Sequence, residues 1–582
     1  MIFADFASRP PVSSRPAWLG LASAMLLAGC ASAPTASLRP PLPAQAEEGQ
    51  ASPYGLFLAG QAAIDAGSSS DAAAYFSQAS AKSPDAAELR ARAFSAALLS
   101  GDIARAAALA PAAGQGDGPL LGLARLVQAV DALSAGRGRE AEAALTGQAS
   151  SGPHHIAAVL LRPWAAAQAG DTAASIAPIA LDGEALQTFA ALSHALLLER
   201  AGKLTQAEAV YHDQLGDKSG VFALSYGQFL ERRGRRPEAV ALYDRALART
   251  PDDPAFRAAR ARAASGRSAP PPPTVREGAA QALIGPAALM LAQKEGELGL
   301  TYLRLALRLD PGLSEAWVLV GDAMDAGGDA DAARDAYQRV KPTSPEYTTA
   351  RGRLALLLQQ AGQKDAALQL AHETVAAAPN DAPALLVLAD LLRDDEKYDE
   401  ATQVLTRLIE RPGAQPDWRL YYLRGASEER AGQWPKAEPD LQRALKLRPE
   451  ESEVLNYLGY AWVERGEHLG EALGMLQRAT ELQPDSGAVV DSLGWARYHL
   501  HDYGAAVREL ERAASLDPAD PEVNSHLGDA YWRTGRRLEA QYQWRRVLTL
   551  KPDARVRTAV EARLQAGLTA ADDAATPPPG PR

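Results

Sequence analysis

The chain has 582 residues, of which 47% are apolar and 23% are charged, so its composition fits neither a disordered polar polymer nor a protein with several membrane spans. Lys and Arg total 60 against 71 Asp and Glu, the net charge is −11, and no long basic run is present, so we expect no nucleic-acid partner. The single cysteine, Cys30, excludes intramolecular disulfides, thiolate zinc sites and iron–sulfur clusters.

The first predicted element is an export signal. Residues 17–27 are apolar or small, which is too short a run to span a bilayer but suits the core of a secretory signal. The tetrapeptide at residues 27–30, Leu-Ala-Gly-Cys, resembles the bacterial lipobox, in which a peptidase cuts before an acylated cysteine. The resemblance implies that residues 1–29 are a lipoprotein signal peptide and that Cys30 is the lipidated mature N-terminus. The alternative is a plain signal with an incidental thiol.

The lipobox also implies a destination. Two or three acyl chains hold a protein on a membrane far longer than one chain does. Ala31 follows the cysteine, where well-studied lipoproteins of the inner membrane carry Asp. By that resemblance we expect the protein at the outer membrane, on its periplasmic side.

Segments without apolar periodicity flank the rest of the chain. Residues 30–52 are rich in Ala, Pro, Ser and Glu and are predicted to form a disordered tether. Residues 569–582 have the same character and are predicted to form a disordered tail.

Between these segments the dominant pattern is a period near 34 residues. Prolines end successive apolar helical runs at intervals of 34, 34, 33, 37, 35, 34 and 34 residues. They are Pro311, Pro345, Pro379, Pro412, Pro449, Pro484, Pro518 and Pro552. A Gly or polar residue recurs between them with the same spacing, as a turn between two amphipathic helices would require.

The repeat resembles the tetratricopeptide repeat (TPR), with a large residue, Leu and Gly in the first helix and Ala and Pro in the second. The clearest copy contains Leu455, Leu458, Gly459, Trp462, Ala472, Leu476, Ala479 and Pro484. Small residues let the two helices approach closely, and the stacked pairs share a continuous core. We therefore expect an all-α TPR solenoid, in which antiparallel helix pairs stack into a right-handed superhelix.

One interruption divides the predicted solenoid. Residues 265–275 contain four consecutive prolines, which favour a stiff extended spacer and cannot lie inside a helix. We predict a TPR-like N-terminal arm over residues 53–264, a Pro-rich linker over 265–275 and a C-terminal TPR arm over 276–568. The number of repeats in the Ala-rich N-terminal arm stays open.

Catalytic and metal-binding motifs are absent from the sequence. It contains no H-E-x-x-H, no phosphate-binding glycine loop and no G-x-S-x-G, and none of the nine histidines lies three or four residues from another. We expect no catalytic residue, no metal, no cofactor, no small-molecule substrate and hence no enzyme.

Binding is the remaining function, and the repeat register predicts its location. In the TPR fold, positions 2, 5, 9, 12 and 13 of each first helix face the concave side, and aromatic groups beside hydrogen-bonding groups favour protein contact. The candidate protein-binding residues are Asn456, Tyr460, Asp491, Trp495, Tyr498, Asp529, Trp532 and Arg533. The alternative is that Trp495 and Trp532 pack between neighbouring repeats.

Residues 456–548 resemble the C-terminal region of a family of long proteobacterial TPR lipoproteins of the outer membrane. The segments that carry the resemblance are NYLGYAW, DSLGWARY, NSHLGDAYW and QWRRVL. That family includes an adaptor of a periplasmic carboxyl-terminal processing protease, which presents cell-wall hydrolases for degradation. The resemblance implies a non-enzymatic, membrane-anchored scaffold with protein partners. The alternative function is a structural assembly factor for export of polysaccharide, a pilus or outer-membrane proteins.

Overall fold

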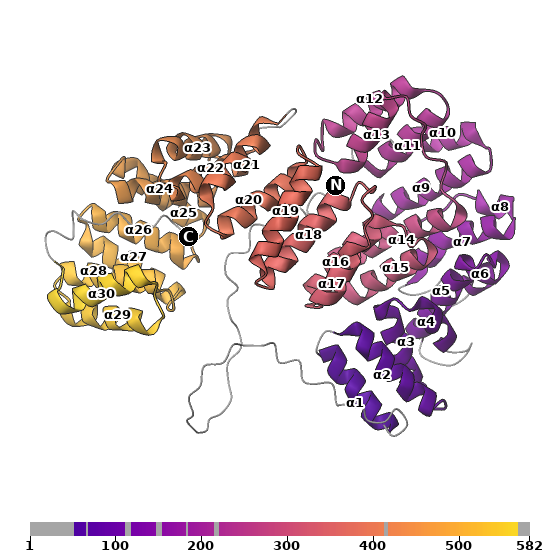
Figure 1. Cartoon of the computed structure of the whole chain (residues 1–582), viewed down its shortest axis with the longest axis horizontal. Helices are drawn as coiled ribbons and strands as arrows, with labels where there is room; N and C mark the ends of the chain where they lie inside the picture. The colour runs from indigo at the N-terminus through magenta and orange to yellow at the C-terminus, as the bar shows by residue number, and fades with distance from the viewer. Residues whose placement is uncertain are drawn as a thin grey trace. The chain divides into compact units, whose positions relative to one another are not determined.

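The computed structural model describes residues 52–65, 68–110, 118–146, 154–181, 184–214, 220–411 and 417–568. The described residues form α-helices joined by short turns and contain no β-strand, which confirms the all-α solenoid (Figure 1). The predicted signal peptide, the lipidation site Cys30, nearly all of the tether, Pro412 and the tail lie outside these residues.

The chain divides into two compact units, residues 1–362 and residues 363–582. The helices of unit 1 are α1 (Pro53–Asp65), α2 (Ser69–Lys82), α3 (Ala87–Ser100), α4 (Ile103–Leu109), α5 (Gly118–Ser134), α6 (Gly138–Ala144), α7 (His155–Ala169), α8 (Thr172–Ser175), α9 (Glu184–Arg200), α10 (Leu204–Asp213), α11 (Gly220–Arg232), α12 (Arg236–Leu247), α13 (Pro254–Ala264), α14 (Val275–Ala292), α15 (Gly296–Leu309), α16 (Ser314–Ala326), α17 (Ala330–Gln338) and α18 (Tyr347–Gln360). The helices of unit 2 are α19 (Lys364–Ala377), α20 (Ala382–Asp394), α21 (Tyr398–Glu410), α22 (Trp418–Arg430), α23 (Trp434–Leu447), α24 (Ser452–Arg465), α25 (Leu469–Leu482), α26 (Gly487–His499), α27 (Tyr503–Leu516), α28 (Pro521–Arg533), α29 (Arg537–Thr549) and α30 (Ala554–Ala566).

The repeat prolines end helices as the sequence predicts. Five of them lie two residues beyond the last residue of a second helix, where the missing N–H removes no helical hydrogen bond. They are Pro311, Pro379, Pro449, Pro484 and Pro518.

The first helix of a pair approaches the second closely because it carries glycine where they cross. In α28, a Cβ atom on Gly528 would lie 2.5 Å from Nε1 of Trp544 in α29. Any larger residue would therefore force the two helices apart. Trp544 is fully buried in the core of unit 2.

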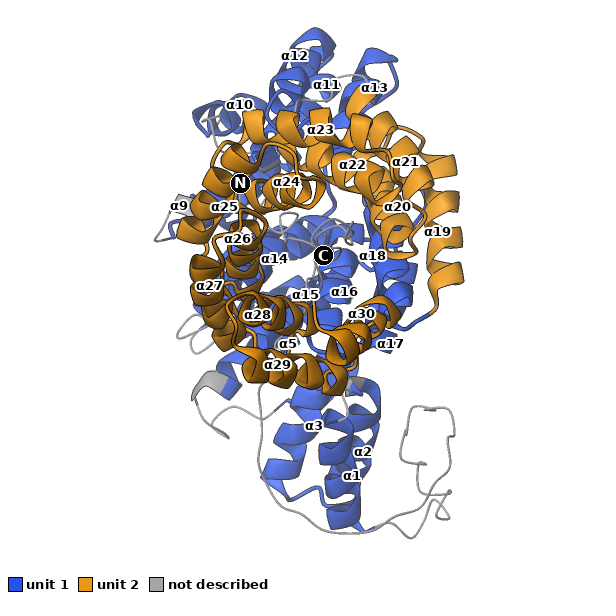
Figure 2. Cartoon of the chain, turned by 90° about the vertical axis from the view of Figure 1, so that its left-hand side faces the viewer, with its two compact units in different colours: residues 1–362 blue, residues 363–582 orange. Residues whose placement is uncertain are grey.

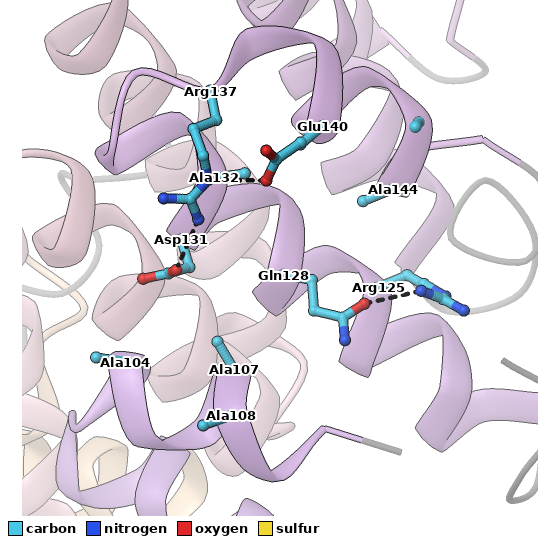
Figure 3. Close-up of a pocket in the computed structure, with 11 residues that line it drawn as sticks. Ala104, Ala107, Ala108, Arg125, Gln128, Asp131, Ala132, Arg137, Glu140 and Ala144 are labelled. Carbon is cyan, nitrogen blue, oxygen red and sulfur yellow. Dashed lines mark hydrogen bonds and ion pairs between the residues drawn. The ribbon is translucent and has the colours of Figure 1, made fainter. Parts of the chain in front are cut away.

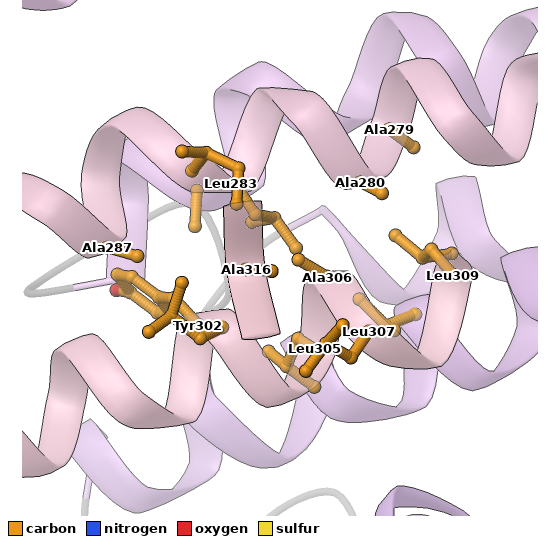
Figure 4. Packing of buried hydrophobic residues seen from close by; sticks show 14 of the residues in the cluster. Ala279, Ala280, Leu283, Ala287, Tyr302, Leu305, Ala306, Leu307, Leu309 and Ala316 are labelled. Carbon is orange, nitrogen blue, oxygen red and sulfur yellow. The ribbon is translucent and has the colours of Figure 1, made fainter. Parts of the chain in front are cut away.

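Unit 1 departs from a simple stack of repeats. Helices α14 and α15 pack against α3, α5, α7 and α9 as well as against each other. Alanines and leucines of both helices belong to one buried cluster (Figure 4). The same cluster contains Trp164 of α7. A Cβ on Gly278 of α14 would lie 2.1 Å from the Trp164 ring. The indole can therefore pack against α14 only because residue 278 is glycine.

Polar contacts join the same distant segments of unit 1. Nδ1 of His154 lies 3.1 Å from the hydroxyl of Tyr302, which is 148 residues further along the chain. Arg308 forms an ion pair with Asp131 at 2.8 Å across 177 residues. The core of unit 1 is thus continuous across the proline-rich segment.

The proline-rich segment is itself held by side chains. It is non-helical between Ala264 and Val275, as predicted. Arg200 of α9 donates a hydrogen bond to the carbonyl of Pro273 at 2.7 Å, and Arg232 of α11 donates to the carbonyl of Pro270 at 2.9 Å. Proline keeps its carbonyl acceptor although it has no N–H, so it suits such a docked segment.

These contacts correct the predicted division of the chain. Residues 265–275 do not separate two cores, because α14 and α15 return to complete the core that α3 to α9 begin. The boundary between compact units lies at residues 362 and 363.

Candidate functional site

The inner side of unit 2 carries the candidate site. Figure 2 shows that α22, α24, α26 and α28 lie on the inner side of the curve that this unit follows, with α23, α25, α27 and α29 outside them. All eight residues predicted to bind protein lie on three consecutive inner helices. Asn456 and Tyr460 are in α24, Asp491, Trp495 and Tyr498 are in α26, and Asp529, Trp532 and Arg533 are in α28.

The structure corrects the expected exposure of the aromatic residues. Trp495 is 5% exposed, Tyr498 7% and Tyr460 6%, so these rings are packed between repeats rather than presented to solvent. Trp532 is only partly buried. Register alone places a residue on the inner helix but does not say whether the next repeat covers it.

Trp495 lies at the centre of a stack of flat side chains. Tyr498 is parallel to it at 4.6 Å between ring centroids, and His526 of α28 is parallel at 3.9 Å. The indole N–H donates a hydrogen bond to Glu464 of α24. Trp495 therefore links three successive repeats, and both faces of its ring are occupied.

Trp532 is covered by the end of the helical region. Its indole N–H donates to the carbonyl of Leu568 at 3.3 Å, and its ring lies 5.2 Å from that of Trp544. The Arg537 guanidinium lies 3.8 Å from the ring centroid, a cation–π contact.

Asp529 and Arg533 also have partners within the chain. Asp529 accepts a hydrogen bond from Trp544 at 2.9 Å and forms an ion pair with Arg563 of α30 at 3.2 Å. Arg533 donates to the Tyr498 hydroxyl at 3.2 Å. These two predicted residues therefore stabilise the stacking of α26, α28 and α30.

The predicted residues surround a buried cluster of ionisable groups. Nδ1 of His526 lies 2.9 Å from Oδ2 of Asp491. Burial by itself lowers the pKa of His526, but the charge and hydrogen bond of Asp491 raise it to about 9, so the ring is an imidazolium at neutral pH. Burial raises the pKa of Glu464 to about 7, although the hydrogen bond from Trp495 opposes this shift.

Three acceptor oxygens in this region have no hydrogen-bonding partner among the described residues. They are Oδ1 of Asn456, Oε2 of Glu464 and Oδ1 of Asp491. The side chain of Glu464 is 2% exposed and that of Asp491 is 8% exposed. Buried acceptors nearly always find a donor, so these atoms mark a place where the fold leaves hydrogen bonds unmade.

Sequence reasoning did not assign His526 or Arg563 to the site, and it assigned Trp544 only to the repeat pattern. His526 is next to the repeat leucine Leu527, at a position that faces the neighbouring repeat and not the groove in the register. Arg563 belongs to α30, which has no repeat signature. Only a comparison of successive first helices, with Asp491 opposite His526, would have suggested the pair.

A separate hollow of about 590 Å³ lies in unit 1, between α4, α5 and α6 (Figure 3). Alanines line much of it. Its polar side chains bond to one another: Arg137 to Asp131 and Glu140, and Arg125 to Gln128. These groups do not form a set of reactive side chains directed at one point.

Within the part of the chain that the structure describes, no group of three or more His, Cys, Asp or Glu side chains is arranged to hold a metal ion. Among the same residues, no helix has both the length and the apolar character that a bilayer crossing requires.

Comparison with known proteins agrees with the repeat pattern. Family models described as "Tetratricopeptide repeat" match residues 274–552 and residues 221–263. Together with the stacked helix pairs, these matches show tetratricopeptide repeats over residues 221–263 and 274–552.

A curated relative is named "TPR repeat-containing protein PA4667" and comes from Pseudomonas aeruginosa. It is 27% identical over 230 residues, which are 39% of this chain and 32% of the relative. The match thus spans about a third of the relative's length.

Solved structures of similar fold include a tetratricopeptide repeat protein from Parabacteroides merdae, with 14% identity and a TM-score of 0.36 over 44% of this chain and 99% of that one. Another is the Cut9–Hcn1 hetero-tetramer of the APC/C, with 15% identity and a TM-score of 0.38 over 88% of this chain and 96% of that one.

Proposed function

We propose that this protein is a non-enzymatic scaffold that binds other proteins along the inner face of unit 2. The observation that carries the proposal is the set of unpartnered acceptors on the inner helices α24 and α26. A repeat that served only as a spacer would gain stability from apolar groups at these positions.

The finer proposal concerns anchoring and partners. Acyl chains on Cys30 would hold the scaffold at the outer membrane, on the periplasmic side. There it would bring a carboxyl-terminal processing protease together with cell-wall hydrolases. The lipobox-like tetrapeptide and the resemblance of residues 456–548 to long TPR lipoproteins support this proposal.

Binding to the protease is tested with purified proteins. The full chain in detergent is mixed with the processing protease encoded in the same genome, and complex formation is measured by light scattering and by the rate of degradation of a wall hydrolase. We expect a stable complex and faster degradation. The assembly-factor alternative would be favoured if the protease does not bind and the rate of hydrolase degradation does not change. It would be favoured further if the chain co-purifies with export components from cells.

Anchoring is tested with Cys30→Ala. We expect the variant to escape cleavage by the lipoprotein peptidase and to be absent from the outer-membrane fraction, because the thiol that carries the lipid is gone. Cys30→Ser is a matched control that keeps the size of the side chain and should behave in the same way. Wild-type protein that takes up no labelled palmitate would contradict the proposal.

A further inference from the structure

The inner face of unit 2 has a recognisable chemical preference. Three of its buried atoms without a hydrogen-bonding partner, Oδ1 of Asn456, Oε2 of Glu464 and Oδ1 of Asp491, are acceptors, and they outnumber the one guanidinium nitrogen in the same state, Nε of Arg497. Asn456 and Asp491 occupy equivalent positions in successive repeats, and Glu464 is eight residues beyond Asn456, about 12 Å along α24. A ligand that satisfies them must bring donors.

The nearby cationic side chains bond to other atoms or lie beyond hydrogen-bonding distance of these acceptors: Arg533 donates to the Tyr498 hydroxyl, and Nε2 of His499 lies 3.9 Å from Oε1 of Glu464. Arg563 pairs with Asp529 at 3.2 Å, and Arg555 lies 3.8 Å from Glu522. His526 uses Nδ1 for Oδ2 of Asp491, which leaves Oδ1 of the same carboxylate. Helices α24, α26 and α28 contain no lysine.

The pairing of His526 shows that the acceptors of this region suit a cation. Its imidazole lies parallel to Trp495 at 3.9 Å, and Nδ1 lies 2.9 Å from Oδ2 of Asp491. A carboxylate ligand would meet Glu464 and Asp491 and would be repelled. An ammonium group offers three donors, and a guanidinium five, to acceptors of this kind.

We infer that the inner face of unit 2, between α24 and α26, binds a lysine or arginine side chain of the partner polypeptide. This inference rests on the proposed function, which supplies a protein partner. It adds which kind of side chain of that partner is bound. Glu464 and Asp491 are the residues that receive the cation, and Asn456 receives a further N–H of the same segment.

The test uses the full chain and four fluorescein-labelled Gly-Ser decapeptides that carry two arginines, two lysines, two citrullines or two glutamates. Fluorescence anisotropy measures the dissociation constants. We expect the arginine and lysine peptides to bind at least tenfold more tightly than the citrulline and glutamate peptides. Equal affinity for all four would overturn the inference.

Variants separate this site from general attraction to an acidic protein. Glu464→Gln with Asp491→Asn removes two charges and keeps the side-chain shapes. Glu471→Gln with Glu481→Gln removes two charges from α25, where the side chains are 74% and 64% exposed. We expect the first pair of substitutions to raise the dissociation constant of the arginine peptide at least tenfold. The second pair should change that constant less than twofold.

Two readouts guard against loss of fold. The melting temperature of each variant is measured, and where the double variant melts early the single variant Glu464→Gln, which keeps the His526–Asp491 pair, is compared in its place. Affinity in wild type should also rise from pH 6 to pH 8 as Glu464, whose pKa burial raises to about 7, ionises while the His526 imidazolium keeps its charge. The other charged or titratable groups around Glu464 are His499, Asp491, Glu522 and Arg555. Glu464→Gln should abolish that rise.

The result is independent of the protease. A protease complex that forms normally with both pairs of variants, together with peptides that do not bind, would remove this inference and leave the proposed function. Peptide binding without any protease complex would do the reverse.

Discussion

At the scale of single residues, unit 2 joins its repeats through polar side chains set among aromatic rings. Trp495, Glu464 and the His526–Asp491 pair come from α24, α26 and α28, so each repeat is bonded to the next by specific atoms. Apolar packing alone would allow slippage between similar repeats. The polar contacts define one register.

Replacement of Trp495 by Ala should lower the stability of unit 2 by about 3–5 kcal/mol, since a large buried ring leaves a cavity and an unpaired carboxylate. Denaturant unfolding followed by circular dichroism measures the loss. Tyr542→Ala is the control, because this tyrosine is 63% exposed on the outer helix α29. An unchanged unfolding midpoint for Trp495→Ala would contradict the packing described above.

The stability of unit 2 should also fall as pH rises from about 5 to 9.5. Glu464 has a folded pKa near 7 against an ordinary 4.5, so its contribution is complete below about pH 4.5 and is lost as pH rises through 7. His526 has a folded pKa near 9 against 6.5, so its contribution is complete below about pH 6.5 and is lost as pH rises through 9.

We therefore expect the free energy of unfolding to decrease by about 2 kcal/mol or more between pH 5 and pH 9.5. Glu464→Gln mimics the neutral acid and should flatten the part of the curve below pH 8. Glu471→Gln, at an exposed site, should leave the curve as it is. A stability that rises over this range would refute the assignment.

The residue scale also shows the reach of sequence reasoning. The repeat register placed all eight candidate residues on inner helices of unit 2. It did not predict that Trp495 is covered by His526, or Trp532 by Leu568, because those partners belong to another repeat or lie beyond the last one. Burial between repeats depends on which side chain the neighbour presents.

At the scale of helices, glycine controls how closely a pair approaches. A Cβ at Gly528 meets the Trp544 ring, whereas a Cβ at Gly474, inside α25, has nothing within 4 Å. The same substitution should thus have opposite effects at the two sites.

Gly528→Ala should destabilise unit 2 by about 1–3 kcal/mol through overpacking. Gly474→Ala should stabilise it by about 0.5–1 kcal/mol, because alanine loses less conformational freedom in a helix. Chemical denaturation of both variants side by side measures the difference. Effects of the same sign would show that the helix spacing adjusts freely.

The helices of unit 1 mark where local patterns were insufficient. Periodicity and proline spacing predicted α14 and α15 as a repeat, which is correct. The proline run favours a stiff separator, and nothing in the local sequence indicates that Arg200 and Arg232 bind its carbonyls. These arginines lie 73 and 38 residues before the prolines that they bind, and contacts between different repeats leave no trace in a 34-residue pattern.

At the scale of the whole molecule, the boundary between units is itself testable. A fragment of residues 53–264 lacks α14 and α15 and would expose Trp164 and much of the cluster around it. We expect that fragment to aggregate or to lose helicity, whereas residues 53–362 and residues 363–568 should each be soluble and helical by circular dichroism. Two well-folded fragments on either side of residues 265–275 would restore the original two-arm division.

The return of α14 and α15 has a consequence for the order of folding. In unit 2 most contacts join neighbours in sequence, so its repeats can form one after another with short loops to close. In unit 1, helices α5 and α7 are synthesised well before the segments that cover them. Arg308, the ion-pair partner of Asp131 in α5, lies 177 residues further along the chain. Until those later segments are made, the apolar faces of α5 and α7 are exposed and can aggregate. We therefore expect the N-terminal half of the chain to depend most on binding by a chaperone during folding.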